Sequence, residues 1–163
     1  RAVREDFGLT IFHAAWLEKR NIAVLLVGGS NSGKTRLGVE LGSDLIAAVR
    51  AAAARLQVVV LLKGAVTVVA EPGGRVFINT HSSPALAVAG SGDVLSELMG
   101  GMLARHFTVR QPDLVELAEL SACAALVHGK AGALVAFPAT SLDVAEKVAA
   151  AVAWAAEATE PAQ

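Results

Sequence analysis

Two glycine-rich segments of this chain have the residue types and spacing of a phosphate-binding site. The first, VGGSNSGKT at 27–35, fits the pattern G-x-x-x-x-G-K-[ST], with Gly28, Gly33, Lys34 and Thr35 in register. In such a loop the backbone N–H groups surround phosphate oxygens, the lysine neutralises negative charge, and the threonine hydroxyl reaches Mg²⁺. This pattern also requires a strand before the loop, and the apolar run IAVLLV at 22–27 predicts one.

A phosphate loop of this kind also needs a metal partner. Enzymes that use it place an acidic residue at the end of a nearby strand to hold Mg²⁺. Here the next apolar run, 58–62, ends at Lys63, and Glu71 falls in a predicted turn. A kinase or NTPase that uses Lys34 and Thr35 therefore stays an alternative interpretation.

The second segment, AGSGD at 89–93, directly precedes a helix that we expect to begin near Asp93. The first N–H groups of a helix have no partner within it, and the helix dipole favours an anion there. Asp93 then has two interpretations. It is either a plain N-cap or a general base that takes a proton from a substrate hydroxyl beside the anion.

The elements that would position these segments alternate in part between apolar strands and amphipathic helices, which is typical of an α/β domain. Strands are predicted at 22–27 and 58–62, followed by a hairpin of 66–70 and 75–79 around the turn EPGG. Helices are predicted at 35–41, 44–56, from about 93, at 112–128 and up to about 156. The last of these follows Thr140-Ser-Leu-Asp143, which resembles a capping box. The length of 163 residues predicts a single domain, 1–163.

The pattern of apolar residues and glycines within the predicted helices indicates which positions pack against other elements. Leu45, Ile46 and Val49 share one face of their helix. The adjacent glycines Gly100-Gly101 carry a helix-propensity cost, which suggests close backbone packing. In the helix from about Asp93 the apolar residues form one stripe: Val94, Leu95, Leu98, Met99, Met102 and Leu103.

The composition excludes several classes of protein. Apolar residues make up 54% of the chain and charged residues 18%, which excludes a disordered chain, and a net charge of −1 offers no attraction to nucleic acid or to an anionic membrane. No apolar run approaches the ~18 residues that span a bilayer, and the charged N-terminus RAVREDFG does not resemble a signal peptide. The single cysteine, Cys123, is predicted to be a small buried hydrophobe and fits a reducing compartment, so we expect a cytoplasmic protein.

The remaining polar residues predict little chemistry. The four histidines lack metal-ligand spacing, so no metal site is predicted. His81 is expected to be an exposed loop residue, and His106 and His128 are expected near helix C-termini, where positive charge is favourable. The acidic residues of the 112–128 helix are expected to form a solvated face: Asp113, Glu116 and Glu119.

Three segments in order carry a family resemblance: VVVLLKGAVTVVAEPGGRVFIN at 58–79, SPALAVAGSGDVLSELMGGMLA at 83–104 and ALVHGKAGALVA at 125–136. Together with the preceding helix, they resemble the C-terminal half of the NAD(P)H-hydrate dehydratases, which belong to the ribokinase-like kinases. The resemblance covers about residues 44–155, whereas 1–43 is a strand-loop-helix pattern without a clear counterpart. It implies a three-layer αβα fold of ribokinase-like type, truncated at its N-terminal half. An exposed sheet edge at that position would favour self-association into a homo-oligomer.

The resemblance also implies a reaction and its site. The reaction is the ADP- or ATP-dependent dehydration of (S)-NAD(P)H-hydrate to NAD(P)H, by phosphorylation of the hydroxyl and loss of phosphate, with Mg²⁺ neutralising charge. Residues Lys63, Gly64, Ala65, Val66 and Thr67 would contact the nucleotide, and Gly90, Ser91 and Gly92 would form the anion hole. Asp93 would contact the substrate and act as the base, with Asn79 and His13 as further substrate-binding residues.

Two departures from the family pattern stand out. Ser82 and Ala85 replace glycines of the loop that follows Asn79, and the glycine and glutamate expected after His13 are missing. An inactive nucleotide-binding remnant is therefore the third interpretation.

Overall fold

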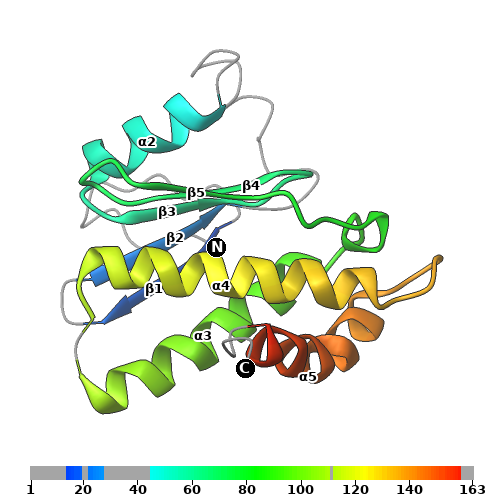
Figure 1. Cartoon of the computed structure of the whole chain (residues 1–163). Helices are drawn as coiled ribbons and strands as arrows, with labels where there is room; N and C mark the ends of the chain where they lie inside the picture. Colours follow the sequence, from blue (N-terminus) through cyan, green and yellow to red (C-terminus); the bar gives the residue numbers. More distant parts are fainter. Residues whose placement is uncertain (1–13, 20–21, 28–44, 111, 159–163) are drawn as a thin grey trace.

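A computed structural model describes residues 14–19, 22–27, 45–110 and 112–158. The structure is a five-stranded mixed sheet in the order β1-β2-β3-β4-β5, with α2 on one face and α3 and α4 on the other (Figure 1). This confirms the predicted α/β class with three layers. The strands are β1 (Ala14–Lys19), β2 (Ile22–Val27), β3 (Val59–Leu62), β4 (Thr67–Ala70) and β5 (Val76–Asn79). The helices are α2 (Leu45–Leu56), the short η2 (Pro84–Leu86), α3 (Ser91–Val109), α4 (Leu114–Ala133) and α5 (Ser141–Glu157).

Strand direction determines which loops share an edge of the sheet. β2 and β3 are parallel, with Val27 opposite Leu62, whereas β3, β4 and β5 form an antiparallel meander. The carboxyl ends of β2 and β3 therefore lie at the same edge of the sheet. The segment after β2 contains Gly28, Gly33, Lys34 and Thr35, which lie outside the described residues, as do His13 and the predicted helix at 35–41.

β3 and β4 are buried on both faces, which explains why VVVLL is apolar without alternation. Val59 and Leu61 pack toward α3 and α4, where they meet Leu95, Met99 and Leu117. On the other face, Val60 and Leu62 pack with Val49 and Ala53 of α2. The central strands thus have a helical layer on each side.

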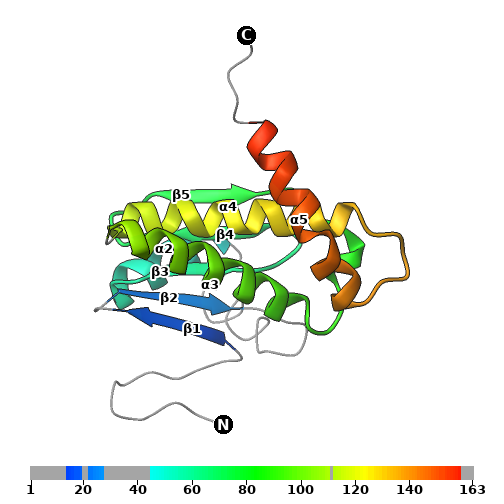
Figure 2. The same ribbon diagram turned by 90° about the horizontal axis from the view of Figure 1, so that it is seen from below.

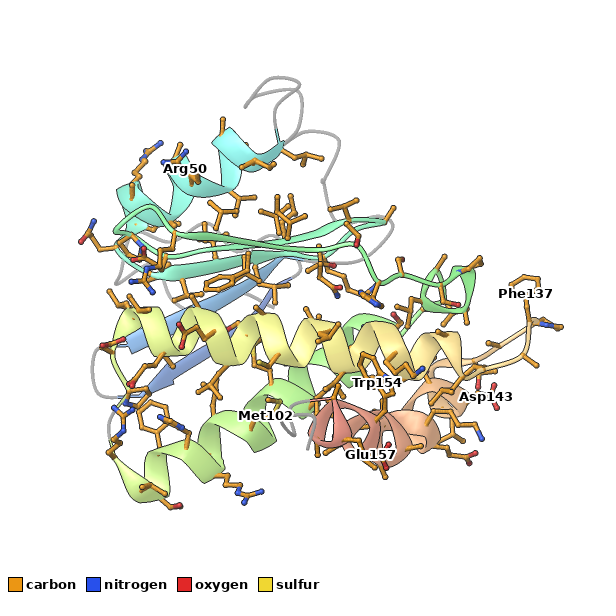
Figure 3. All side chains as sticks on the ribbon, viewed as in Figure 1. Arg50, Met102, Phe137, Asp143, Trp154 and Glu157 are labelled. Carbon is orange, nitrogen blue, oxygen red and sulfur yellow. The ribbon has the colours of Figure 1, made fainter. Side chains whose placement is uncertain are left out.

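A smaller apolar cluster joins α4 to α5. Figure 2 shows α5 crossing α4 at a steep angle, and Val127 and Ala131 of α4 pack with Val144 and Ala151 of α5. Trp154 of α5 lies beside α4 in Figure 3, and the Nζ of Lys130 lies 4.7 Å from its ring centroid. These contacts fix α5 against the end of α4 that follows His128.

Many of the predicted elements are confirmed. β2 and the hairpin of β4 and β5 occur where expected, and the glycine of the turn, Gly74, has a positive φ of 100°. The capping box of α5 is present between Thr140 and Asp143. The stripe on α3 is confirmed, with Leu95, Met99 and Leu103 buried.

Other predictions about elements were wrong. β1 was not predicted, because AAWLEK has no regular alternation of apolar residues. α4 continues to Ala133, five residues beyond His128, because Gly129 and Gly132 are helical here. α3 begins at Ser91 rather than near Asp93.

Three predictions about side chains were also wrong. Leu45 and Ile46 are exposed, and only Val49 of that trio is buried, because α2 rests on the sheet through Ala48, Val49 and Ala53. Cys123 is exposed, since its helical position points away from the core. A Cβ placed on Gly100 or Gly101 would meet no atom of the described residues within 4 Å, so close packing against that part of the chain does not explain these glycines.

The acidic face of α4 is only partly a solvated surface. Asp113 and Glu116 form a capping box at the start of α4. Glu116 is half-buried and pairs with Arg110, which lowers the pKa of the glutamate. This pair connects the end of α3 to the start of α4.

Candidate functional site

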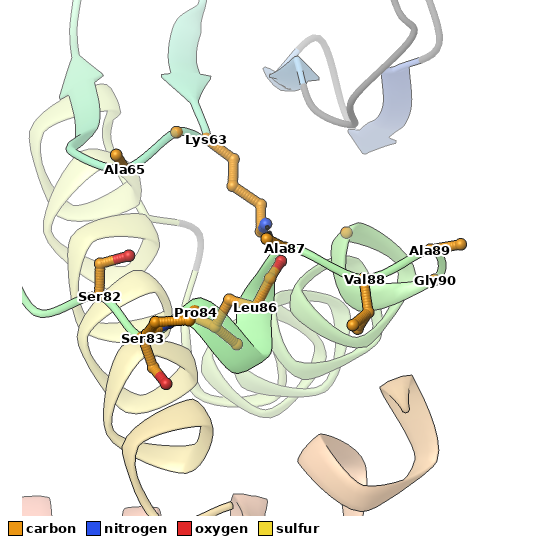
Figure 4. A pocket seen from close by; sticks show the side chains of 12 residues that line it. Lys63, Ala65, Ser82, Ser83, Pro84, Leu86, Ala87, Val88, Ala89 and Gly90 are labelled. Atoms are coloured by element: carbon orange, nitrogen blue, oxygen red, sulfur yellow. Dashed lines mark hydrogen bonds between the residues drawn. The ribbon is translucent and has the colours of Figure 1, made fainter. Parts of the chain in front are cut away.

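A pocket of about 540 Å³ lies between the segment after β3 and the start of α3 (Figure 4). Its wall comes from two stretches that are distant in sequence: the turn after β3, and the η2 loop together with the start of α3 that directly follows it. The lining residues are Lys63, Gly64, Ala65, Ser82, Ser83, Pro84, Leu86, Ala87, Val88, Ala89, Gly90 and Gly92. The structure thus brings together the two segments that the sequence assigned to nucleotide and anion binding.

The start of α3 has no side-chain cap. Its N-cap residue is Gly90, whose φ of 83° lies in the left-handed region that favours glycine. The N–H of Ser91 donates to Val88 O at 3.3 Å, and the N–H of Asp93 donates to Gly90 O at 3.0 Å. Within the part of the chain that the structure describes, the N–H of Gly92 has no hydrogen-bond acceptor. Gly92 lines the pocket, so this helix start offers a free donor to an anion.

Asp93 is the third residue of α3. The N-cap interpretation of Asp93 is therefore wrong, because Gly90 holds that position. The Asp93 side chain is exposed and does not line the pocket itself. Its carboxylate stands on the first turn of α3, next to the pocket-lining Gly92.

Lys63 connects the end of β3 to the η2 loop. Its Nζ donates to the carbonyl oxygen of Leu86 at 3.3 Å, and the side chain crosses the pocket in Figure 4. The same carbonyl accepts a hydrogen bond from Ser91 Oγ at 2.8 Å. Leu86 O therefore links the lysine to the first residue of α3, and Ser91 itself is buried beneath the pocket rather than in its wall.

The turn after β3 carries the other residues assigned to the nucleotide. The N–H of Gly64 donates to Thr67 Oγ1 at 3.5 Å, which closes the turn. Thr67 is buried, and Val66 is exposed on the outer side of the turn. Gly64 and Ala65 line the pocket, whereas Val66 and Thr67 do not.

Asn79, at the end of β5, already has protein partners for both ends of its amide. Its Nδ2 donates to Ala125 O of α4 at 2.8 Å, and its Oδ1 accepts from the N–H of His81 at 2.9 Å. Asn79 does not line the pocket. In this structure it anchors the hairpin and the following loop to α4.

His128 is the residue that the sequence interpretation missed. It was expected to complement a helix C-terminus as a positive charge, which is wrong. The side chain is only 2% exposed, and its Nε2 lies 2.8 Å from Ser91 O. Burial, assisted by the nearby charge of Lys63, lowers the pKa of His128 to about 4. His128 is therefore neutral near pH 7, and its position within the apolar run ALVHGKAGA was the available signal.

Two glycines of α4 let the η2 loop approach closely. A Cβ on Gly129 would lie 2.3 Å from His81 O, and one on Gly132 would lie 2.5 Å from Leu86 Cδ2. Three residues apart, they share one face of the helix. Their spacing in the sequence, G-x-x-G, was a second signal for this contact.

The other histidines are less involved. His81 is exposed, as predicted, and its ring centroid lies 6.3 Å from that of Trp154. His106 lies in the last turn of α3, as predicted, and its Nε2 is buried without a partner among the described residues. In the same part of the chain no three His, Cys, Asp or Glu side chains gather as a metal-binding group, and no helix is long and apolar enough to cross a membrane.

Comparison with known proteins places this arrangement in a family. The family model described as NAD(P)H-hydrate dehydratase matches residues 29–159. The chain belongs to the NAD(P)H-hydrate dehydratase family. The matched range contains the whole pocket and the start of α3, and it begins within the VGGSNSGKT segment.

Individual relatives agree with the family. The chain is 48% identical over 101 residues to the bifunctional NAD(P)H-hydrate repair enzyme Nnr of Synechocystis, covering 62% of this chain and 18% of that protein. It is 36% identical over 129 residues to the Nnr of Mycobacterium leprae, covering 78% of this chain and 26% of that protein. An ADP-dependent (S)-NAD(P)H-hydrate dehydratase of Neisseria meningitidis is 38% identical over 93 residues, covering 56% of this chain and 28% of that protein. The matched part of the chain thus spans only 18% to 28% of the length of these three relatives.

A solved structure shows the same fold. YxkO of Bacillus subtilis, a member of the UPF0031 family, superposes with a TM-score of 0.55 at 26% sequence identity. The similarity covers 76% of this chain and 42% of YxkO. The described elements therefore correspond to part of that larger domain.

Proposed function

We propose that this chain supplies the nucleotide-phosphate site of an ADP-dependent enzyme that dehydrates (S)-NAD(P)H-hydrate to NAD(P)H. One observation carries the proposal: the uncapped start of α3 and the side chain of Lys63 line the same pocket. Family membership supports the substrate, and the name of the Neisseria relative supports ADP rather than ATP. The alternative phosphate loop with Lys34 and Thr35 gains no support from these relatives.

The pocket suits a phosphate chain for electrostatic reasons. The positive end of the α3 dipole and the free N–H of Gly92 favour an anion at Gly90–Gly92. Lys63 adds a full positive charge on the opposite wall, next to Gly64 and Ala65. Mg²⁺ would enter with the nucleotide and neutralise part of the phosphate charge.

Asp93 is proposed as the base. Its exposed carboxylate, on the first turn of α3, would take the proton from the substrate hydroxyl while that oxygen attacks the terminal phosphoryl group of ADP. AMP leaves in this step. Phosphate then leaves the nicotinamide ring, a neighbouring C–H proton is lost, and the ring double bond is restored. The first turn of α3 would stabilise the negative charge of the transferred group.

The test compares two acidic residues on one helix. Asp93→Asn removes the base, whereas Glu97→Gln neutralises the exposed carboxylate one turn further along α3. We expect Asp93→Asn to lower ADP-dependent formation of NADH from its hydrate by roughly 10²- to 10⁴-fold, the usual contribution of a general base. The Glu97→Gln variant should keep the rate of the unmodified chain. Absorbance at 340 nm measures the product, and calorimetric titration measures ADP affinity.

The outcomes separate the interpretations. Equal rates for the Asp93→Asn and Glu97→Gln variants would show that Asp93 is not the base. ADP binding without turnover in the unmodified chain would favour an inactive remnant. If ADP does not bind and turnover is absent, the proposed function is wrong for this chain.

A further inference from the structure

The buried side chain of His128 joins α4 to the first residue of α3. Its Nε2 lies 2.8 Å from the carbonyl oxygen of Ser91, across 37 positions of sequence. The ring is 2% exposed, in a stretch of α4 whose other buried residues are Val127, Gly129 and Ala131. A polar ring in such surroundings is costly unless its hydrogen bond is made.

The chemistry of this contact determines the tautomer. A carbonyl oxygen only accepts hydrogen bonds, so the proton of the neutral ring must be on Nε2. Burial, together with the nearby charge of Lys63, lowers the pKa of His128 and opposes a second proton. Near neutral pH, His128 is therefore a permanent single donor to Ser91 O.

The accepting carbonyl belongs to the peptide group that joins Ser91 to Gly92. In a trans peptide the C=O and the N–H lie in one plane and point in opposite directions. A donor that holds Ser91 O therefore also sets the direction of the Gly92 N–H. That N–H is the one in the first turn of α3 without an acceptor among the described residues, and Gly92 lines the pocket.

We propose that His128 is a positioning residue, which holds the Ser91–Gly92 peptide so that the Gly92 N–H points at the bound phosphate. The inference rests on the proposed function for the identity of the anion, but the peptide orientation itself does not. The hydrogen bond from Ser91 Oγ to Leu86 O holds the side chain of the same residue. His128 and Leu86 together thus fix Ser91 from two directions.

The first test uses the unmodified chain. The ¹⁵N shifts of the His128 ring report which nitrogen carries the proton, and we expect Nε2–H between pH 6 and 8. A ring protonated on Nδ1 would overturn the proposal, because Nε2 could then not donate to Ser91 O. This measurement does not depend on any variant folding.

The second test uses three variants of the full chain. Gln places an amide nitrogen near the position of Nε2, whereas Asn is too short to reach Ser91 O and Leu has no donor. We expect His128→Asn and His128→Leu to shift the Gly92 amide signal and the Ser91 carbonyl ¹³C signal, and His128→Gln to restore both. Turnover should fall about 10- to 100-fold in the Asn and Leu variants, since a misdirected donor acts mainly on the transition state. The KM for ADP should change less than the kcat.

Each outcome decides the proposal. Unchanged Gly92 and Ser91 signals in His128→Leu would overturn it, as would altered signals with turnover equal to that of the unmodified chain. Equal loss in His128→Gln and His128→Leu would also contradict it, because the restored donor would then have no effect. If the unmodified chain lacks turnover, the proposed function fails, and the ring tautomer and the Gly92 signal still decide whether His128 holds the peptide.

Discussion

The starts of α3 and α5 touch each other, yet they are held by opposite means. A Cβ on Gly90, the N-cap of α3, would lie 2.7 Å from Oγ of Ser141, the first residue of α5. α5 is capped locally: Thr140 Oγ1 accepts from the N–H of Asp143, and Asp143 Oδ2 accepts from the N–H of Thr140. α3 has no side-chain cap, and its first residue is held instead by His128 from α4.

The difference separates a structural helix start from one that can bind a ligand. A capping box occupies two of the free N–H groups at a helix start, here those of Thr140 and Asp143, so these two are not available to an anion. At α3 the holding contact goes to the carbonyl side of the Ser91–Gly92 peptide and leaves the Gly92 N–H free. As a consequence, the start of α3 depends on His128, a residue 37 positions away in the sequence.

The largest effect that we expect from this difference is on pH dependence. The pKa of His128 is about 4 in the folded chain, below its ordinary value of 6.5, so between these values the unfolded chain binds the extra proton and the folded chain does not. The contribution of His128 to the free energy of unfolding is therefore fully present above about pH 6.5. It is lost as the pH falls toward 4, and the loss amounts to ~3 kcal/mol. Denaturant unfolding from pH 4 to 7 measures this loss.

His128→Gln is the control for that experiment, because it keeps a donor that does not titrate. Its unfolding free energy should lack the part of the fall between pH 6.5 and 4 that comes from His128. Parallel curves of unfolding free energy against pH for the two chains would contradict the assignment of this effect to His128.

The cap of α5 depends on pH in a different range. Hydrogen bonds from Thr140 lower the pKa of Asp143. The stability from this cap is therefore present at neutral pH and is lost only as the pH falls through that lowered value.

A second change breaks the α3 start directly. Gly90→Ala adds a Cβ at a positive φ and places it against Ser141. We expect it to lower the free energy of unfolding by ~2 kcal/mol, since L-residues are strained there, and to weaken ADP binding. Thermal unfolding and ADP titration measure the two effects. Unchanged values for both would show that the glycine is not required.

The matching change at α5 should affect stability alone. Thr140→Ala removes the capping box and should cost ~1 kcal/mol. ADP affinity should stay at the level of the unmodified chain, because Thr140 does not line the pocket. A large loss of ADP affinity would mean that the two helix starts are not functionally distinct.

The smallest effect is expected from a glycine in the interior of α3. Gly101 is exposed, and a Cβ there meets no described atom within 4 Å. Gly101→Ala should raise the free energy of unfolding by ~0.5–1 kcal/mol, the helix propensity difference between the two residues. Urea unfolding measures this change. A destabilised variant would indicate that Gly101, like Gly90, is required by a close contact.

Local patterns predicted much of the fold. The apolar runs of β2 and β3, the EPGG hairpin and the Thr140–Asp143 capping box depend on residues close in sequence, and all were confirmed. AAWLEK lacked a pattern, because β1 gains its pairing from β2 rather than from its own residues. The start of α3 was expected near Asp93, two residues after its actual start, because Asp93 has the side chain of a capping residue whereas the positive φ of Gly90 has no side-chain signature.

The candidate site divides in the same way. The sequence by itself determined the glycine-rich segments, Lys63 after a buried strand, and the family resemblance, because these depend on residue type and local order. Only the tertiary structure decided that Lys63 and Gly92 line one pocket, that Asn79 is bound to α4, and that His128 holds Ser91. The physical reason is that these contacts join residues dozens of positions apart. Each depends on how β3, α3 and α4 pack, which no local spacing encodes.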